Sequence, residues 1–338
     1  MKKVFLQSFP FFIILLLFSC SHDPVQKTNT INPDVYVSGV KANHACYWKN
    51  NQLFTLNDLS ATESEADTII VSGTDVHILG AKNTSSNPIS LYWKNGSVTN
   101  LNSAFSTSTE PCIGVGKMDI YNNDVYFLGM TQNTTVTPNT YNLAYWKNGV
   151  KTIIATYPTE NIIYTGMKII NNNVYVTIYA EINGTLLNGY YVNQTFVPIT
   201  NAILWDCDSD GTDPYIYGRN SANYNSYYKN LNTNIETSIS NSSAILKMCF
   251  DNGNIYCTNG ETLFKNGNIY LSYTGVNTYN DYYTINSFQI VDDSLFLMTD
   301  ETINTNPGSL KLQRLLIENV LYQQNGTDEV FNSLFIAH

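Results

Sequence analysis

The chain has 338 residues, of which 13% are charged and 13% are aromatic, and its formal net charge is −10. The charged share is about half of what soluble domains usually carry, and aromatic and β-branched residues are too abundant for a disordered chain. The composition also excludes a coiled coil or helical bundle, and the negative charge argues against binding nucleic acid through its phosphates. The 45 asparagines and 19 glycines favour strands joined by tight turns.

The first twenty residues have the layout of a secretory signal. Lys2 and Lys3 precede an apolar run, Phe9 to Phe18, that is too short to span a membrane as a helix. The run ends in Leu17-Phe18-Ser19-Cys20, which resembles the lipobox of bacterial lipoproteins. In that family the cysteine is acylated and becomes the first residue of the mature protein.

This resemblance implies three parts: a signal peptide over residues 1–19, a lipidated Cys20 with a polar tether over 20–33, and a single domain over 34–338. An ordinary signal peptide with an incidental cysteine is the alternative. Several acyl chains would give stable anchoring. By resemblance to lipoprotein sorting in two-membrane bacteria, Ser21 favours the outer membrane. Asp23 is the one acidic residue that closely follows Cys20. Both the periplasmic and the surface face of the outer membrane therefore remain open as locations.

Five cysteines follow the lipobox, and because five is odd at least one must lack a partner within the chain. Cys249 and Cys257 flank a turn, and a three-residue loop would place them opposite each other as a disulfide. We expect free, half-buried thiols instead.

A short motif recurs seven times along the rest of the chain. Its first copy is Asp34-Val35-Tyr36-Val37-Ser38-Gly39, and the residue aligned with Val35 recurs at positions 76, 125, 174, 215, 255 and 295. A second motif follows each copy, most clearly as Tyr92-Trp93-Lys94-Asn95-Gly96 and Tyr145-Trp146-Lys147-Asn148-Gly149. Asn-Gly is the preferred pair for a type I′ hairpin turn, so this motif predicts a strand ending in a tight turn.

Each repeat therefore predicts four antiparallel strands, which is the makeup of a β-propeller blade of roughly 40–50 residues. The first blade lacks its own first strand, and the segment Phe331–Ile336 at the end of the chain supplies one. We expect an all-β propeller of seven blades closed by this C-terminal strand, which removes an open sheet edge. The Tyr-Trp-Lys-Asn-Gly repeats resemble propeller-like repeats of secreted bacterial lipoproteins over nearly all of residues 33–338, a resemblance that implies no activity.

The sharpest local signal is a run of aspartates followed by glycine, Asp206-Cys207-Asp208-Ser209-Asp210-Gly211-Thr212-Asp213. Alternating carboxylates before a glycine match the first half of a calcium loop. The EF-hand pattern is incomplete, since its twelfth position is Tyr217. The segment predicts either a structural Ca²⁺ site at Asp206, Asp208, Asp210 and Asp213 or an acidic turn. No other cofactor is predicted.

Signals for catalysis are weak. Two histidines, His44 and His77, lie in the body, and no nucleophile motif is present. The acids that could pair for glycoside cleavage are scattered in expected loops: Glu63, Glu65, Asp67, Glu110, Glu160 and Glu181. The recurring Trp48, Trp93, Trp146 and Tyr191 favour packing between blades over a sugar platform, and the recurring lysines at positions 49, 94, 147, 229 and 265 favour solvated side chains.

Segments that break the repeat are the better place to look for function. The expected long loops 82–90, 131–141 and 302–310 are rich in uncharged hydrogen-bonding residues, which suits a neutral polar ligand such as a glycan and equally a plain exposed loop. We predict an outer-membrane-anchored, monomeric lipoprotein that acts as a non-catalytic binding or scaffold propeller. Its ligand would be a glycan or a partner protein, not nucleic acid. The alternative is a carbohydrate-active hydrolase or lyase that uses loop carboxylates.

Overall fold

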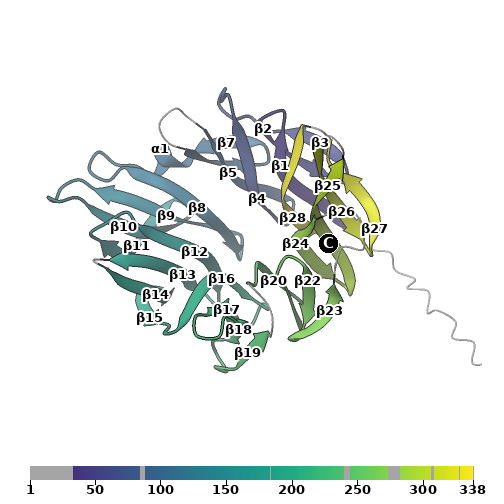
Figure 1. Ribbon diagram of the computed structural model, residues 1–338. Helices are drawn as coiled ribbons and strands as arrows, with labels where there is room; N and C mark the ends of the chain where they lie inside the picture. The colour runs from purple at the N-terminus through teal and green to yellow at the C-terminus, as the bar shows by residue number, and fades with distance from the viewer. Residues whose placement is uncertain are drawn as a thin grey trace, which may run out of the picture. The chain divides into compact units, whose positions relative to one another are not determined.

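The computed structural model describes residues 33–83, 88–182, 184–239, 244–272, 282–305, 308–326 and 328–337. Within them the chain forms seven four-stranded antiparallel sheets, the blades of a β-propeller (Figure 1). The fold class and the predicted blade count are confirmed. The predicted signal peptide and Cys20 lie outside the described residues. No helix in the described part of the chain is long and apolar enough to cross a membrane.

The strands are given from the inner strand of each blade outward. The first blade contains β28 (Glu329–Ala337), β1 (Asp34–Lys41), β2 (His44–Lys49) and β3 (Gln52–Thr55). The second contains β4 (Ser64–Ser72), β5 (Asp75–Lys82), β6 (Ile89–Lys94) and β7 (Ser97–Asn100). The third contains β8 (Cys112–Tyr121), β9 (Asp124–Asn133), β10 (Thr140–Lys147) and β11 (Val150–Tyr157).

The remaining four blades follow the same order. The fourth contains β12 (Ile162–Ile170), β13 (Asn173–Ile182), β14 (Thr185–Val192) and β15 (Thr195–Pro198). The fifth contains β16 (Ala202–Ser209), β17 (Pro214–Asn220), β18 (Ser226–Asn230) and β19 (Glu236–Ile239). The sixth contains β20 (Lys247–Asp251), β21 (Asn254–Thr258), β22 (Thr262–Lys265) and β23 (Asn268–Ser272). The seventh contains β24 (Tyr282–Val291), β25 (Ser294–Thr305), β26 (Gly308–Ile317) and β27 (Val320–Gln324).

The ring is closed by its last strand, as predicted. β28 pairs antiparallel with β1 from Asp34–Ala337 to Lys41–Glu329, and its neighbours on either side are the inner strands β24 and β4. The N-terminal strand thus receives its partner from the opposite end of the chain (Figure 1). This pairing leaves β1 with no open edge.

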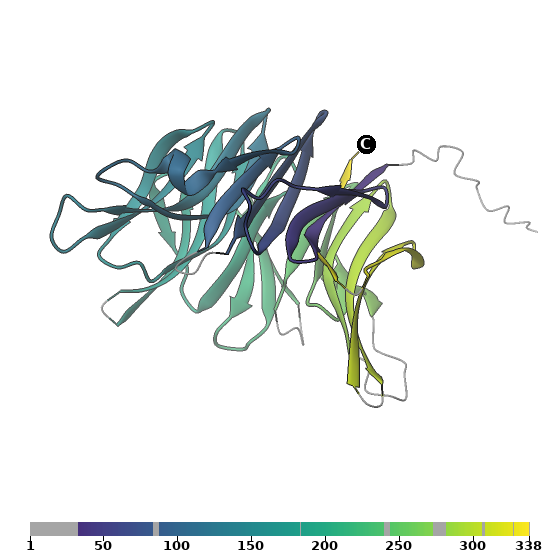
Figure 2. The same cartoon turned by 90° about the horizontal axis from the view of Figure 1, so that it is seen from above.

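One short helix interrupts the strands, and one expected loop needs correction. The helix α1 (Leu101–Phe105) follows β7, and the Asn100 side chain caps it by accepting a hydrogen bond from the Ser103 N–H. Strands β25 and β26 extend through most of the expected loop 302–310. Figure 2 shows the far end of this hairpin projecting beyond the neighbouring blades.

The glycine that ends the first motif has a steric role. It lies opposite a bulge in the inner strand, and a Cβ added at Gly80 would stand 2.0 Å from the carbonyl oxygen of Glu65. The corresponding distances at Gly39, Gly129 and Gly218 are 1.9, 2.2 and 2.1 Å. Glycine therefore recurs here because the backbones approach too closely for any side chain.

The predicted type I′ turns are confirmed by backbone angles. Asn95 and Gly96 have φ of 51° and 81°, and Asn148 and Gly149 have φ of 48° and 86°.

The turn at Asn252 and Gly253 is equally tight, so Cys257 lies opposite Met248 in the strand register and not opposite Cys249. The five described cysteines are free thiols, and four of them are buried. The expectation of free thiols is confirmed.

The repeated lysines are not simply solvated, which corrects the expectation from sequence. In the first blade Lys49 forms an ion pair of 2.6 Å with Asp34, and the Asn50 amide donates to the same carboxylate at 2.7 Å. The Asn50 side-chain oxygen in turn accepts the Val35 N–H. The second and third blades repeat this arrangement, which we call the Asp-Lys-Asn cluster, at Asp75-Lys94-Asn95 and Asp124-Lys147-Asn148.

The repeated aromatic residues pack between blades, as predicted. The exposed fractions of Trp48, Trp93, Trp146 and Tyr191 are 3%, 0%, 1% and 6%. Trp93 of the second blade shares a buried cluster with Tyr36 and Ala45 of the first.

The strand register also corrects the alignment of the fifth repeat by one residue. Pro214, not Tyr215, occupies the position of Val35, which places Lys229 where the first blade has Trp48.

Candidate functional site

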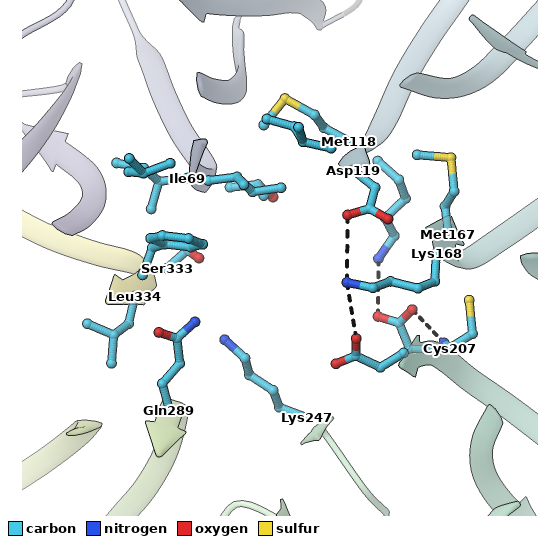
Figure 3. Close-up of a pocket in the computed structure, with 18 of the residues that line it drawn as sticks. Ile69, Met118, Asp119, Met167, Lys168, Cys207, Lys247, Gln289, Ser333 and Leu334 are labelled. Atoms are coloured by element: carbon cyan, nitrogen blue, oxygen red, sulfur yellow. Dashed lines mark hydrogen bonds and ion pairs between the residues drawn. The ribbon is translucent and has the colours of Figure 1, made fainter. Parts of the chain in front are cut away.

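A pocket of about 560 Å³ lies at the propeller axis, and the inner strands of all seven blades contribute to its wall (Figure 3). Its volume falls in the range of ligand pockets, roughly 300–1,000 Å³. A second cavity of about 370 Å³ shares Lys168, Asp208, Lys247 and Gln289 with it and continues to Asp210. We call the first of these the axial pocket.

The inner strands place two rows of seven residues around the axis, because side chains two apart on a strand share a face. The register against the second strand of each blade defines both rows. The first row is Thr68, Lys117, Gly166, Asp206, Lys247, Ser287 and Ser333. The second row is Ile70, Asp119, Lys168, Asp208, Cys249, Gln289 and Phe335. Most members of both rows line the axial pocket.

The charged members are concentrated on the third to sixth blades. Lys168 of the fourth blade stands between two carboxylates, 3.6 Å from Asp119 and 3.3 Å from Asp208 (Figure 3). Burial alone would lower the pKa of Lys168, but the two carboxylates outweigh it and raise the pKa. Burial raises the pKa of Asp119, against the opposing effects of Lys168 and of the Ile169 N–H that donates to it at 2.8 Å.

Asp206 fills space that its neighbour leaves free. A Cβ on Gly166 would stand 1.7 Å from the Asp206 Oδ1, so the glycine on the adjacent inner strand makes room for this carboxylate. Lys117 lies 3.8 Å from Asp206, a loose ion pair. Burial raises the pKa of Asp206 to about 6, although Lys117 and the Cys207 N–H favour its charged form.

The opposite side of the pocket is mostly neutral. Lys247 and Gln289 extend toward the open space from the sixth and seventh blades (Figure 3). Burial lowers the pKa of Lys247, and the opposing effects of Cys249 and of the carboxylates of Asp208 and Asp206 do not outweigh it. Ser333 and Phe335 of the closing strand and Ile70 of the second blade complete the wall.

The four aspartates predicted as calcium ligands occupy two separate environments. Asp206 and Asp208 face the axial pocket, where lysines pair with them. Asp210 and Asp213 lie in the hairpin turn, where Asp210 accepts the Asp213 N–H and Asp213 accepts the Asn230 and Asn232 amides. Among the described residues, no group of three or more His, Cys, Asp or Glu side chains is placed to hold a metal ion. Structural calcium stays a prediction.

The other residues singled out from sequence lie away from this pocket. His77 is buried inside a strand and contacts the Tyr92 hydroxyl at 2.6 Å, and His44 contacts Asp58 at 2.7 Å. Glu110, one of the loop acids, forms an ion pair with Lys151 at 2.7 Å. None of the six acids expected in loops lines the axial pocket, and three of them lie in strands instead: Glu65 and Asp67 in β4 and Glu181 in β13.

The pocket residues themselves were missed by sequence reasoning, which looked for deviations from the repeat in the loops. A signal was present in the inner strands. Aligned at the first motif, the strands that precede it carry a lysine or an aspartate at one or both of the two pocket-facing positions in each of the third to sixth blades. Charged residues in strands that otherwise alternate apolar and polar residues could have marked this surface.

No family model matches the chain, and no curated protein is similar to it. Solved structures share its fold at low identity. One is a quinonprotein alcohol dehydrogenase-like protein from Bacteroides thetaiotaomicron, with 10% identity and a TM-score of 0.49 over 89% of this chain and 77% of that one. Another, assigned as a 6-phosphogluconolactonase from Bacteroides fragilis, has 11% identity and a TM-score of 0.44 over 92% of this chain and 99% of that one.

A third similar structure comes from a study of two prolyl endopeptidases, with 10% identity and a TM-score of 0.48. The match covers 84% of this chain but only 50% of that one, so this chain corresponds to about half of that enzyme. The propeller fold follows from the seven sheets themselves, and likenesses this distant say nothing of function.

Proposed function

We propose that the protein is a lipoprotein anchored to the outer membrane, and that it acts as a non-catalytic binding propeller whose axial pocket takes part of a glycan. The observation that carries the proposal is the axial pocket, where polar side chains from several blades converge on one open space. Pockets of this kind, with a few directed polar groups among apolar ones, are the usual form of a small-ligand site.

Apolar side chains in the pocket wall support a glycan as ligand. Leu246 lines the pocket and is 52% exposed, directly before Lys247. Phe335 of the closing strand supplies an aromatic ring to the same wall. Sugar rings present one apolar face and a rim of hydroxyls, so they suit a site with an aromatic ring and charged hydrogen-bonding groups in one wall.

The pairing of the carboxylates supports binding over catalysis. A glycosidase needs one carboxyl group as acid and a second as nucleophile or base. Here Lys168 lies beside Asp119 and Asp208, and Lys117 lies beside Asp206. Paired in this way, the carboxylates serve better as fixed hydrogen-bond acceptors for hydroxyl groups.

The binding proposal is tested by calorimetric titration of the purified domain, residues 33–338, with a panel of neutral and acidic oligosaccharides. We expect at least one to bind, and the variant Leu246→Ala to weaken that binding. The control variant Val150→Ala, at an exposed outer position, should bind like the wild type. Absence of binding across the panel would contradict a glycan ligand and leave the partner protein of the sequence prediction as the next ligand to test.

The anchor is tested separately in cells of a two-membrane bacterium. The lipobox residues Leu17 to Cys20 support lipidation, so the full chain should incorporate labelled palmitate and sediment with the outer membrane. Cys20→Ala should lose both. A Cys20→Ala protein that still carries label would rule out this cysteine as the lipid site.

A carbohydrate-active enzyme is the second candidate, and one observation favours it. Asp119, Asp206 and Asp208 line a single pocket, and a pKa of about 6 would let Asp206 donate a proton near neutral pH. Release of reducing ends from a polysaccharide, lost in Asp206→Asn, would establish this function in place of pure binding.

A further inference from the structure

Two hydrogen-bond donors face the same open space of the axial pocket. They belong to Lys247 on β20 and Gln289 on β24, whose side chains extend toward each other in Figure 3. Their positions follow from the sheet register, which places Lys247 in the first row of pocket residues and Gln289 in the second.

The orientation of the Gln289 amide is fixed by the closing strand. Its Oε1 accepts the Ile336 N–H at 2.7 Å, and because only an oxygen can accept this bond, the Nε2 is the group turned into the pocket. The amide therefore presents two N–H donors to the open space. No acceptor among the described residues bonds to them.

Lys247 is the pocket lysine without a carboxylate partner. Lys117 and Lys168 each form ion pairs with pocket aspartates, whereas Lys247 donates one hydrogen bond of 2.7 Å to the Ser287 Oγ and forms no ion pair within the described residues. An ammonium group has three donors and accepts nothing. At least two of its N–H groups are available to a ligand, and burial lowers its pKa as expected for a cation that lacks a counter-charge.

We propose that Lys247 and Gln289 bind a carboxylate group, and that the glycan recognised at the axial pocket is therefore an acidic one that bears a uronic acid or a similar sugar. The space between two hydrogen-bond donors is filled favourably only by an acceptor. Charge-assisted hydrogen bonds to a carboxylate are among the strong hydrogen bonds in proteins. This inference rests on the proposed function.

The neighbouring charges favour a single negative charge over a doubly charged group. Asp206 and Asp208 on the adjacent inner strand would repel a phosphate dianion more than a carboxylate. One ammonium and one amide also match the charge and the two oxygens of a carboxylate. The carboxylate could come from a glycan or from a free acid, and the experiment separates these sources.

Three probes are titrated into the purified domain by calorimetry: trigalacturonic acid, a neutral galactose trisaccharide and free galacturonic acid. We expect the acidic trisaccharide to bind at least about tenfold more tightly than the neutral one, since hydrogen bonds to charged groups contribute most. Free galacturonic acid should bind more weakly than the acidic trisaccharide, because it makes fewer contacts.

Two variants test the assigned donors. Lys247→Met removes the charge and keeps the length of the side chain. Gln289→Glu keeps an oxygen for the Ile336 N–H and replaces the pocket-facing donor with an acceptor. Each should remove the tenfold preference for the acidic trisaccharide. Lys94→Met, which changes a half-exposed lysine of an outer turn, is the matched control and should bind as the wild type does. Melting temperatures confirm that each variant is folded.

The outcomes separate the two proposals. Equal binding of both trisaccharides, unchanged in Lys247→Met, would overturn the carboxylate site and leave glycan binding intact. Binding of free galacturonic acid that depends on Lys247, without binding of either trisaccharide, would support the carboxylate site and overturn the glycan. Failure of all three probes to bind would overturn both.

Discussion

The outer turns and the inner strands of this propeller follow different rules. At the outer turns, the Asp-Lys-Asn cluster recurs with nearly the same distances in three consecutive blades, with Lys–Asp contacts of 2.6, 2.7 and 2.8 Å. At the axis, the second row changes from isoleucine to aspartate to lysine across the second, third and fourth blades. In the second and third blades, therefore, the outer turn is copied and the inner strand is not.

The difference separates residues that build the fold from residues that give the molecule its particular surface. Every blade faces the same requirement, to close a hairpin and pack against its neighbour, so the solution recurs. The axial pocket exists once, and each blade contributes a different side chain to it. Paired charges such as Lys168 with Asp119 and Asp208 contribute little to stability, because desolvation offsets their attraction.

The largest effect is expected from a repeated residue. Trp93 is fully buried between the first and second blades, and Trp93→Ala should lower the free energy of unfolding by about 3–5 kcal/mol, through lost burial and the cavity that remains. Denaturant unfolding measures it. Val150→Ala, at a residue that is 70% exposed, is the control. A loss of unfolding free energy below about 1 kcal/mol for Trp93→Ala would contradict the view that repeated residues build the fold, since such small values are typical of surface sites.

A repeated turn residue should have a smaller effect. Asn148 has φ of 48° and bonds both Val125 N–H and Asp124, so Asn148→Ala should cost about 1–3 kcal/mol from strain and lost hydrogen bonds. Asn148→Gly tolerates the positive φ and loses the hydrogen bonds alone. Denaturant unfolding of both variants separates the two causes. Equal losses in the two would argue against strain.

Substitution of a pocket residue should stabilise the protein instead of destabilising it. Because the folded-state pKa of Asp206, about 6, lies above its ordinary value, the folded protein binds more protons than the unfolded chain between about pH 4 and 6, and this group makes the fold less stable as pH rises. Asp206→Asn should therefore stabilise the protein at pH 7, by about 1 kcal/mol after solvent screening. The difference from wild type should vanish near pH 4, as melting temperatures across the range would report. A destabilised variant at pH 7 would place Asp206 among the residues that build the fold.

The smallest effect is expected from metal removal. Asp210 and Asp213 already accept hydrogen bonds within the turn, and Asp206 and Asp208 already face lysines. Melting curves with and without excess chelator should therefore nearly coincide. A fall of several degrees on chelation would instead establish the structural calcium that the aspartate spacing suggests.

The blades could be predicted from sequence because the evidence for them is repeated and local. Asn-Gly turns and the recurring Val-Tyr and Tyr-Trp-Lys patterns each report the same hairpin several times. The pocket could not be predicted in this way, because its residues come from strands far apart in the chain and meet only when the ring closes. The one-residue shift at Pro214 shows a further limit, since the longer acidic turn hides the alignment of the fifth blade.

The closing strand has a consequence for how the chain must fold. Of the described strands, β1 is synthesised before all others and β28 after them, so β1 keeps an unpaired edge until β28 has been made. Contacts between such distant segments form late, after the cost of closing a long loop has been met. Until that moment β1 is free to pair with a strand of another chain, and any truncation before residue 329 would make this hazard permanent.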